Sequence, residues 1–180
     1  MDSANEFAVH GARVAERSGK GMLGALAIGA LALDQFTKYL VEHHTELGSV
    51  HTVIPGLLNI MHTSNTGVAF GIFADSANPW RAPLLISSSV LVIGLLVWLL
   101  ATGRAGARLG EWGVALILGG AVGNVFDRLV RRSVTDFIDF HIGNYHWYTF
   151  NVADSAIVIG AFLVILELFR DHARGSGERA

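Results

Sequence analysis

Four apolar stretches constrain this chain more than any other feature of its sequence. They cover residues 22–41, 82–101, 112–130 and 152–169, and about 20 apolar residues in a helix are enough to cross a bilayer. Charged residues make up only 16% of the chain, against about 25% in an ordinary soluble domain. The sequence therefore predicts a membrane α-helical protein, built as a four-transmembrane-helix bundle.

The remaining segments complete the predicted organisation. Residues 1–21 are polar and are expected to form a disordered cytoplasmic tail, residues 171–180 form a second cytoplasmic tail, and residues 22–170 form a single integral membrane domain. The competing interpretation of the first stretch is a cleaved signal peptide, because Ala30-Leu31-Ala32 is similar to a small-x-small cleavage site. Apolar character continues to Val41, which favours a span instead.

Lysine and arginine residues predict the orientation of the spans. Eight of them lie on the side of the two termini and the short loop 102–111, and five lie on the other side. Because cytoplasmic segments carry the excess of positive charge, both termini are expected in the cytoplasm. Segments 42–80 and 131–151 are then outside.

The two outer segments have different patterns. Within 42–80, the β-prone runs 51–54 and 57–61 are separated by Pro55-Gly56, which favours a turn. We expect a small extracytoplasmic sheet here, followed by a turn over 65–71 that leads back to the bilayer. Residues 134–151 are expected to form a periplasmic loop that carries three polar residues on its surface, Asp139, His141 and His146.

Two aspartates, Asp136 and Asp154, mark the ends of this loop at the membrane boundary. A carboxylate there is costly unless it is paired, solvated or used for chemistry. Two nearby carboxylates can share one proton, so that one activates water and the other polarises a carbonyl. That pattern indicates peptide hydrolysis. It also fits a loop residue and a residue in the first turn of a helix, where the dipole favours a carboxylate.

Further polar residues lie inside the apolar stretches. Asp34 and Lys38 are four residues apart on one helix face, which predicts an ion pair inside the bundle. Gly119 and Gly123 have the GxxxG spacing that allows close helix approach. A polar stripe on the same stretch must face protein or water, and its members are Gly120, Asn124, Asp127 and Arg128.

Several classes of site are excluded by what the chain lacks. It has no cysteine, which excludes disulfides, thiolate metal sites and a cysteine nucleophile. No His-Glu-x-x-His motif is present, and the serines at 87–89 have no base on their helix, so zinc and serine proteases are not expected. No basic run indicates nucleic acid. We expect neither a metal nor a cofactor.

Two other functions fit a small membrane protein with these carboxylates. A proton-coupled transporter could use Asp34, Asp127 and Asp154 as relay groups, but the inner halves of the helices, such as 23–28 and 157–166, are nearly all apolar. A structural membrane adaptor leaves the pairing of Asp136 with Asp154 unexplained.

Four ordered blocks of the sequence resemble the prolipoprotein signal peptidase family, also called signal peptidase II. They are LDQFTK at 33–38, NTGVAF at 65–70, GGAVGNVFDR at 119–128 continuing to DFID at 136–139, and FNVAD at 150–154. The resemblance covers about residues 22–169.

The resemblance implies an aspartyl endopeptidase of the bacterial cytoplasmic membrane, the inner membrane. It would remove signal peptides from prolipoproteins, cutting just before a cysteine that carries a diacylglyceryl group. By motif, Asp136 and Asp154 match the catalytic pair, and residues 42–80 match the family's β-cradle, which holds the substrate. The matches to supporting positions are Asp34, Lys38, Asn65, Gly67, Asn124, Arg128, Asn151 and Ala153. The resemblance also implies a monomer surrounded by phospholipid and inhibited by globomycin.

One position departs from the family pattern. Between Arg128 and Asp136 the family usually has a glycine, and the corresponding residue here is Arg132. Our hypothesis is that the pair Arg131-Arg132 binds anionic lipid headgroups, which would neutralise two outer arginines.

Overall fold

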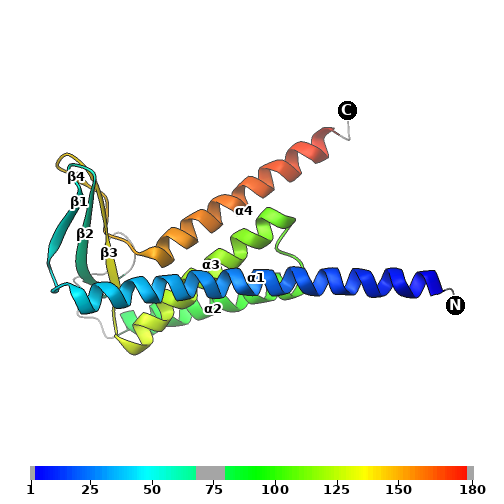
Figure 1. Cartoon of the computed structure of the whole chain (residues 1–180), viewed down its shortest axis with the longest axis horizontal. Coiled ribbons are helices and arrows are strands. Elements are labelled where there is room, and N and C mark those ends of the chain that lie inside the picture. The colour runs from blue at the N-terminus through cyan, green and yellow to red at the C-terminus, as the bar shows by residue number, and fades with distance from the viewer. Residues whose placement is uncertain (1–2, 68–79, 178–180) are drawn as a thin grey trace.

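The computed structural model describes residues 3–67 and 80–177, which contain four helices and four strands. Figure 1 shows the strands gathered at one end of the helices, whereas the start of α1 and the end of α4 lie at the opposite end. In chain order the elements are α1 (Ser3–His44), β1 (Val50–Ile54), β2 (Leu58–Asn65), α2 (Arg81–Thr102), α3 (Arg108–Val130), β3 (Val134–Ile142), β4 (Tyr145–His146) and α4 (Val152–Gly177).

Three helices in the described part of the chain are long and apolar enough to cross a membrane. They are Ala82–Thr102, Arg108–Val130 and Val152–His172, which confirms the second, third and fourth predicted stretches as membrane-capable helices. The first stretch is helical too, within α1. It does not reach the same hydropathy because Asp34, Gln35 and Lys38 interrupt it, so its crossing stays a prediction.

The expected disorder of residues 1–21 is wrong from Ser3 onward, because α1 is continuous from Ser3 to His44. The polar segment contains no proline, and it carries several alanine, glutamate and arginine residues, which are strong helix formers. Once the apolar part has nucleated a helix, adding such residues costs little.

The strands form one antiparallel sheet in the order β1-β2-β3-β4. The hairpin of β1 and β2 confirms the predicted β-prone runs, and Gly56 supplies the positive φ of its turn at 77°. Of the expected turn over 65–71, the part after Gly67 lies outside the described residues.

Strand β3 corrects the expectation of a loop over 134–151. It pairs along β2, with Thr63 opposite Asp136 and Asn59 opposite Asp139. The segment has the β-branched and aromatic residues that favour strands, and its Val134 and Phe137 are buried. The segment was expected to be a loop because two of its nine residues are aspartates, which are uncommon in strands. The strand fixes the position of Asp136.

Three glycines of α3 allow it to touch two helices closely. A Cβ atom at Gly119 would overlap the carbonyl oxygen of Ala27 in α1, and one at Gly120 would overlap the carbonyl oxygen of Ala153 in α4. A Cβ at Gly123 would lie 2.6 Å from Oδ2 of Asp34. This confirms the close approach predicted from the GxxxG spacing, and it brings the polar stripe of α3 against α1 and α4.

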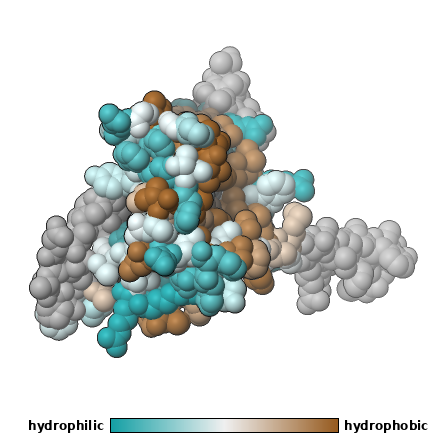
Figure 2. Space-filling model, turned by 60° about the vertical axis from the view of Figure 1, so that its left-hand side comes forward, coloured by the Kyte–Doolittle hydropathy of each residue, from teal (hydrophilic) through white to brown (hydrophobic). Residues whose placement is uncertain are grey.

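The surface divides between the two parts of the fold. Figure 2 shows hydrophilic residues gathered on the end formed by the sheet, with hydrophobic residues behind it over the helices. At the other end, the guanidinium of Arg104 lies 5.0 Å from the ring centre of Trp98 and that of Arg108 lies 5.4 Å from Trp112. Tryptophan and arginine at a helix end are typical of a membrane interface.

Arg132 is the one non-glycine residue with positive φ in the described chain, at 64°. For a residue with a Cβ atom, this left-handed conformation costs about 1–2 kcal/mol, a cost that glycine does not have. We therefore expect Arg132→Gly to stabilise the fold by up to about 1 kcal/mol, after the added chain entropy of glycine is subtracted. Thermal unfolding in detergent measures this.

Arg132→Ala is the matched control, because it removes the same charge but keeps the Cβ atom. Its unfolding temperature should stay close to that of the wild type. An equal gain in both variants would attribute the effect to charge and contradict the backbone explanation.

Candidate active site

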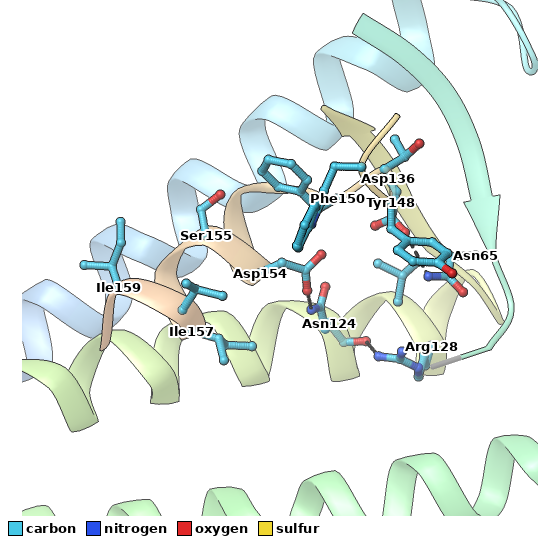
Figure 3. A pocket seen from close by; sticks show the side chains of 14 residues that line it. Asn65, Asn124, Arg128, Asp136, Tyr148, Phe150, Asp154, Ser155, Ile157 and Ile159 are labelled. Atoms are coloured by element: carbon cyan, nitrogen blue, oxygen red, sulfur yellow. Dashed lines mark hydrogen bonds between the residues drawn. The ribbon is translucent and has the colours of Figure 1, made fainter. Parts of the chain in front are cut away.

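Asp136 and Asp154 line the same pocket, which has a volume of about 640 Å³. Asp136 lies on β3 and is only 3% exposed, and Asp154 lies in the first turn of α4. Figure 3 shows these two side chains with Asn65, Asn124 and Arg128 around one cavity. Strand, helix start and the polar stripe of α3 therefore converge on one site.

Asp154 is fixed by a reciprocal cap at the start of α4. Its backbone N–H donates to Oδ1 of Asn151 at 2.9 Å, and its own Oδ2 accepts the N–H of Asn151 at 3.2 Å. This is the capping-box arrangement, which satisfies two helix N–H groups. The structural interpretation of Asp154 as a first-turn residue is thus correct. Its other oxygen, Oδ1, accepts a 2.8 Å hydrogen bond from Nδ2 of Asn124, which also lines the pocket.

Asp136 receives one amide donor on each carboxylate oxygen. Nδ2 of Asn65 donates to Oδ2 at 2.9 Å, and Nδ2 of Asn151 donates to Oδ1 at 2.7 Å. The amide of Asn65 is itself oriented by the N–H of Gly67, which donates to its Oδ1 at 2.9 Å. Burial raises the pKa of Asp136 to about 6; the charge of Asp154 raises it as well, while the two amides and the charge of Lys38 oppose the rise.

The two carboxylates are joined through two asparagine side chains. Nδ2 of Asn151 donates to Asp136 and also lies 3.3 Å from Oδ1 of Asn124. Asn124 in turn donates to Asp154. Because each amide has a fixed partner at both ends, the path Asp136–Asn151–Asn124–Asp154 holds both aspartates in a defined relation.

A buried ion cluster lies directly behind this path. Nζ of Lys38 is 2.8 Å from Oδ2 of Asp34, 2.6 Å from Oδ2 of Asp127 and 3.0 Å from Oδ1 of Asn124. The side chains of Asp34, Lys38 and Asp127 are completely buried. Asp34 also accepts the N–H of Ala153 through Oδ1 at 2.8 Å. The predicted Asp34–Lys38 pair is confirmed, and it orients Asn124 while tying α1 to the start of α4.

Arg128 connects the pocket wall to the chain that follows β2. Its Nη1 donates to the carbonyl oxygen of Asn124 and its Nη2 to that of Gly67, both at 3.1 Å. All eight predicted supporting residues are therefore within this network or bonded to it.

The expectation for Asp139 and His141 was wrong. Asp139 is 1% exposed, accepts Nδ2 of Asn59 at 2.8 Å and contacts Nδ1 of His146 at 2.9 Å, and His141 is buried as well. His146 is exposed, as expected. Burial raises the pKa of Asp139, but the hydrogen bonds from Asn59 and His146 and the two histidine charges outweigh it, so the pKa lies below its ordinary value. The apolar/polar alternation over 138–142 indicates a strand, but it would place Asp139 and His141 on the solvated face, so it does not predict their burial.

Arg131 is bonded to side chains of the protein itself. Its Nε lies 3.2 Å from Oε1 of Glu42, and its Nη1 contacts Oδ1 of Asp127 and Oε1 of Gln35. These contacts do not test headgroup binding by the Arg131-Arg132 pair, which stays a hypothesis; of the two side chains, Arg132 is the exposed one.

The pocket has a polar and an apolar part. The carboxylates, the asparagines and Arg128 form the polar part. The apolar part comes from the chain before α4 and from the first turns of α4, and its members are Trp147, Tyr148, Phe150, Ile157, Val158 and Ile159. Within residues 3–67 and 80–177, no cluster of three or more histidines or carboxylates is arranged to hold a metal ion. Such a pocket suits a ligand with an apolar chain and a polar reactive group.

Comparisons with known proteins agree on one family. The family model "Signal peptidase (SPase) II" matches residues 26–170. The lipoprotein signal peptidase of Solibacter usitatus is 46% identical over 151 residues, which cover 81% of this chain and 90% of the relative. That of Maridesulfovibrio salexigens is 35% identical, covering 83% and 96%.

A solved structure described as a bacterial membrane enzyme superposes with a TM-score of 0.77 at 30% identity, covering 86% of this chain and 91% of that one. The matches span the helices, the sheet and the pocket together. The chain is a membrane protein that belongs to the signal peptidase II family of peptidases.

Proposed function

We propose that the chain is an aspartyl endopeptidase that removes signal peptides from diacylglyceryl-modified prolipoproteins, cutting just before the lipidated cysteine. The observation that carries the proposal is the presence of Asp136 and Asp154 in one pocket that has a polar wall and a larger apolar wall. The carboxylates suit hydrolysis, and the apolar wall suits a substrate with acyl chains and an apolar signal peptide.

In the proposed reaction one aspartate is ionised and the other is protonated, because two nearby carboxylates resist double ionisation. We assign the charge to Asp154, since the N-terminus of a helix favours a carboxylate, and the proton to Asp136, which is more buried. Asp154 takes a proton from water as the water attacks the scissile carbonyl, and Asp136 gives its proton to the carbonyl oxygen, which forms a tetrahedral diol. Asp136 then takes back a proton from one hydroxyl as the C–N bond breaks, and Asp154 gives its proton to the leaving amine, so both carboxyl groups return to their starting states. No covalent intermediate is needed.

The orientation of the bundle supports a pocket on the outer face of the bacterial inner membrane. Figure 1 shows the start of α1 and the end of α4 at the end away from the sheet. The excess of lysine and arginine lies at that end, which favours the cytoplasm. We propose that four crossings, α1 included, place both termini inside and the dyad outside, in a monomer surrounded by phospholipid.

The transporter alternative has less support. It needs carboxylates that exchange protons with water along a path. Asp34 and Asp127 are fully buried and are both paired with Lys38.

The test of the proposed function is cleavage of a diacylated lipoprotein precursor by the purified protein in detergent. Mass spectrometry should find a new N-terminus at the lipidated cysteine, and globomycin should block its formation. The matched substrate has serine in place of the cysteine, cannot be acylated, and should stay intact. A wild-type protein that cuts neither substrate would refute the proposal.

A further inference from the structure

Glu42, in the last turn of α1, contacts two other elements next to the pocket. Its Oε1 accepts a 2.6 Å hydrogen bond from Oγ1 of Thr135 and lies 3.2 Å from Nε of Arg131. Thr135 precedes Asp136 in β3, and Arg131 follows the last residue of α3. One carboxylate oxygen therefore joins the ends of two helices to the start of the strand that carries Asp136.

We propose that Glu42 is a positioning residue for Asp136, which holds the start of β3 against the ends of α1 and α3 through Thr135 and Arg131. The inference rests on the proposed function, in which Asp136 takes part in the reaction. Glu42, Arg131 and Thr135 are not among the residues quoted above for the family resemblance, which are 33–38, 65–70, 119–128, 136–139 and 150–154.

The anchor is firm because Arg131 is itself held. Besides Glu42, Arg131 contacts Asp127, which is fully buried and paired with Lys38. Charged hydrogen bonds of this kind are about twice as strong as neutral ones. The glutamate and arginine side chains are only 20% and 28% exposed, so water screens their attraction less than it would on an open surface.

The bond between Glu42 and Thr135 also holds β3 at a point where its pairing with β2 is irregular. The register of β2 and β3 is irregular between the pairs at Ile60 and Thr63, immediately beside Asp136. Across this irregularity the Oγ1 of Thr63 donates to the carbonyl oxygen of Asp136 at 3.0 Å. The Thr135–Glu42 bond holds the preceding residue from the opposite side. Together the two bonds hold the backbone around Asp136, whose carboxylate oxygens accept the amides of Asn65 and Asn151.

The experiment compares Glu42→Ala with wild type in cleavage of the diacylated precursor. We expect kcat to fall about 10-fold to 100-fold with little change in KM, because a displacement of about 1 Å at a reacting group can cost about 10²-fold. Thr135→Val removes the same hydrogen bond while keeping the side-chain shape, and it should reproduce the loss. The double variant should be no worse than Glu42→Ala alone, since that variant already lacks the Thr135–Glu42 bond, whereas Glu42→Ala also loses the contact with Arg131 and can therefore be worse than Thr135→Val. Thr135→Ser should restore cleavage.

The pH profile separates positioning from simple loss of stability. The groups that face Asp136 are the charges of Asp154, Lys38 and Arg128 and the amides of Asn65 and Asn151. A displaced Asp136 is better hydrated, so its pKa should fall from about 6 toward 3.8. Because Asp136 acts in its protonated form, the decline of activity with rising pH should begin at a lower pH than in wild type. A residue that only supports the fold would lower the unfolding temperature and leave this profile unchanged.

Glu167 provides the matched control. It is a buried glutamate of α4 that also bonds to the end of another helix: its Oε2 accepts the N–H of Leu109, at the start of α3, at 3.2 Å on the far side of the bundle from the sheet. Glu167→Ala should lose stability but keep the wild-type kcat and pH profile.

Wild-type kcat and pH profile in both Glu42→Ala and Thr135→Val would overturn the inference while leaving the proposed function intact. Should Glu42→Ala fail to fold, Thr135→Val decides alone. Absence of cleavage by the wild type would instead refute the proposed function.

Discussion

Asparagine in place of either Asp136 or Asp154 should abolish cleavage of the diacylated precursor while leaving the chain folded. Asp154→Asn cannot accept the proton of the attacking water, and Asp136→Asn has no acidic proton to give to the scissile carbonyl oxygen. Loss of acid–base catalysis of this kind typically costs about 10²–10⁴-fold in rate. Single-turnover cleavage, followed by mass spectrometry, measures the loss without interference from product release.

The stability of Asp136→Asn should differ from that of wild type in a pH-dependent way. Because burial raises the pKa of Asp136 from 3.8 to about 6, the folded protein holds this proton more tightly than the unfolded chain does. The wild type therefore loses stability as the pH rises from about 4 to about 6, by at most about 3 kcal/mol. The neutral amide does not pay this cost, so Asp136→Asn should unfold at a higher temperature than wild type at pH 8 and at a similar temperature at pH 4.

Asp139→Asn is the matched control for this prediction. It introduces the same change on the same strand, at a carboxylate that is also buried but is bonded to Asn59 and His146 and does not line the pocket. It should keep most of the cleavage. If Asp136→Asn and Asp154→Asn still cut the precursor while folded, the aspartates would be structural and the aspartyl mechanism would be excluded.

The features that the sequence predicts well are those set by local pattern. Long apolar runs predicted the helices α2, α3 and α4, because nothing except a helix or a closed barrel satisfies the backbone in lipid. Pro55-Gly56 predicted the β1–β2 turn, and the i,i+4 spacing predicted the Asp34–Lys38 pair, now seen at 2.8 Å. In each case the interacting groups are close in the chain.

The features that the sequence did not predict depend on contacts between distant residues. Strand β3 was expected as a loop because its aspartates look solvated until Asn59 and Asn65 of β2 are placed beside them. Glu42 was not identified at all, since its partner Thr135 is 93 residues away. The resemblance to signal peptidase II named the two aspartates of the pocket and the asparagines and arginine beside them, but it named none of the apolar wall and did not show which atoms meet.

Replacing Lys38 with methionine should cause a large loss of stability. Lys38 is completely buried, and its ammonium faces the carboxylates of Asp34 and Asp127. Methionine has a similar length but no charge, so two buried anions would lose their shared cation. Removing one partner of a buried ion pair costs about 3–5 kcal/mol. Thermal unfolding in detergent should show a large decrease.

The cause of this loss can be separated from a loss of packing by a second substitution. The double variant Lys38→Met with Asp34→Asn has the same packing change at position 38 but only one unpaired anion, Asp127. It should therefore be more stable than Lys38→Met alone. Lys20→Met is the matched control on α1, because Lys20 is exposed, and it should leave the unfolding temperature nearly unchanged. If the double variant were less stable than Lys38→Met alone, the uncompensated charge would not be the cause.

The same substitution should impair cleavage in whatever fraction remains folded. Lys38 donates to Oδ1 of Asn124, and this bond turns the Nδ2 of Asn124 toward Asp154. Without the ammonium, Oδ1 of Asn124 keeps only the 3.3 Å contact with Nδ2 of Asn151, so the amide is held less firmly and its hydrogen bond to the carboxylate of Asp154 weakens. Because Asp154 must be ionised to accept a proton from water, kcat should fall even at temperatures where Lys38→Met with Asp34→Asn is fully folded. Restored stability with restored kcat in that double variant would show that Lys38 acts on the fold alone.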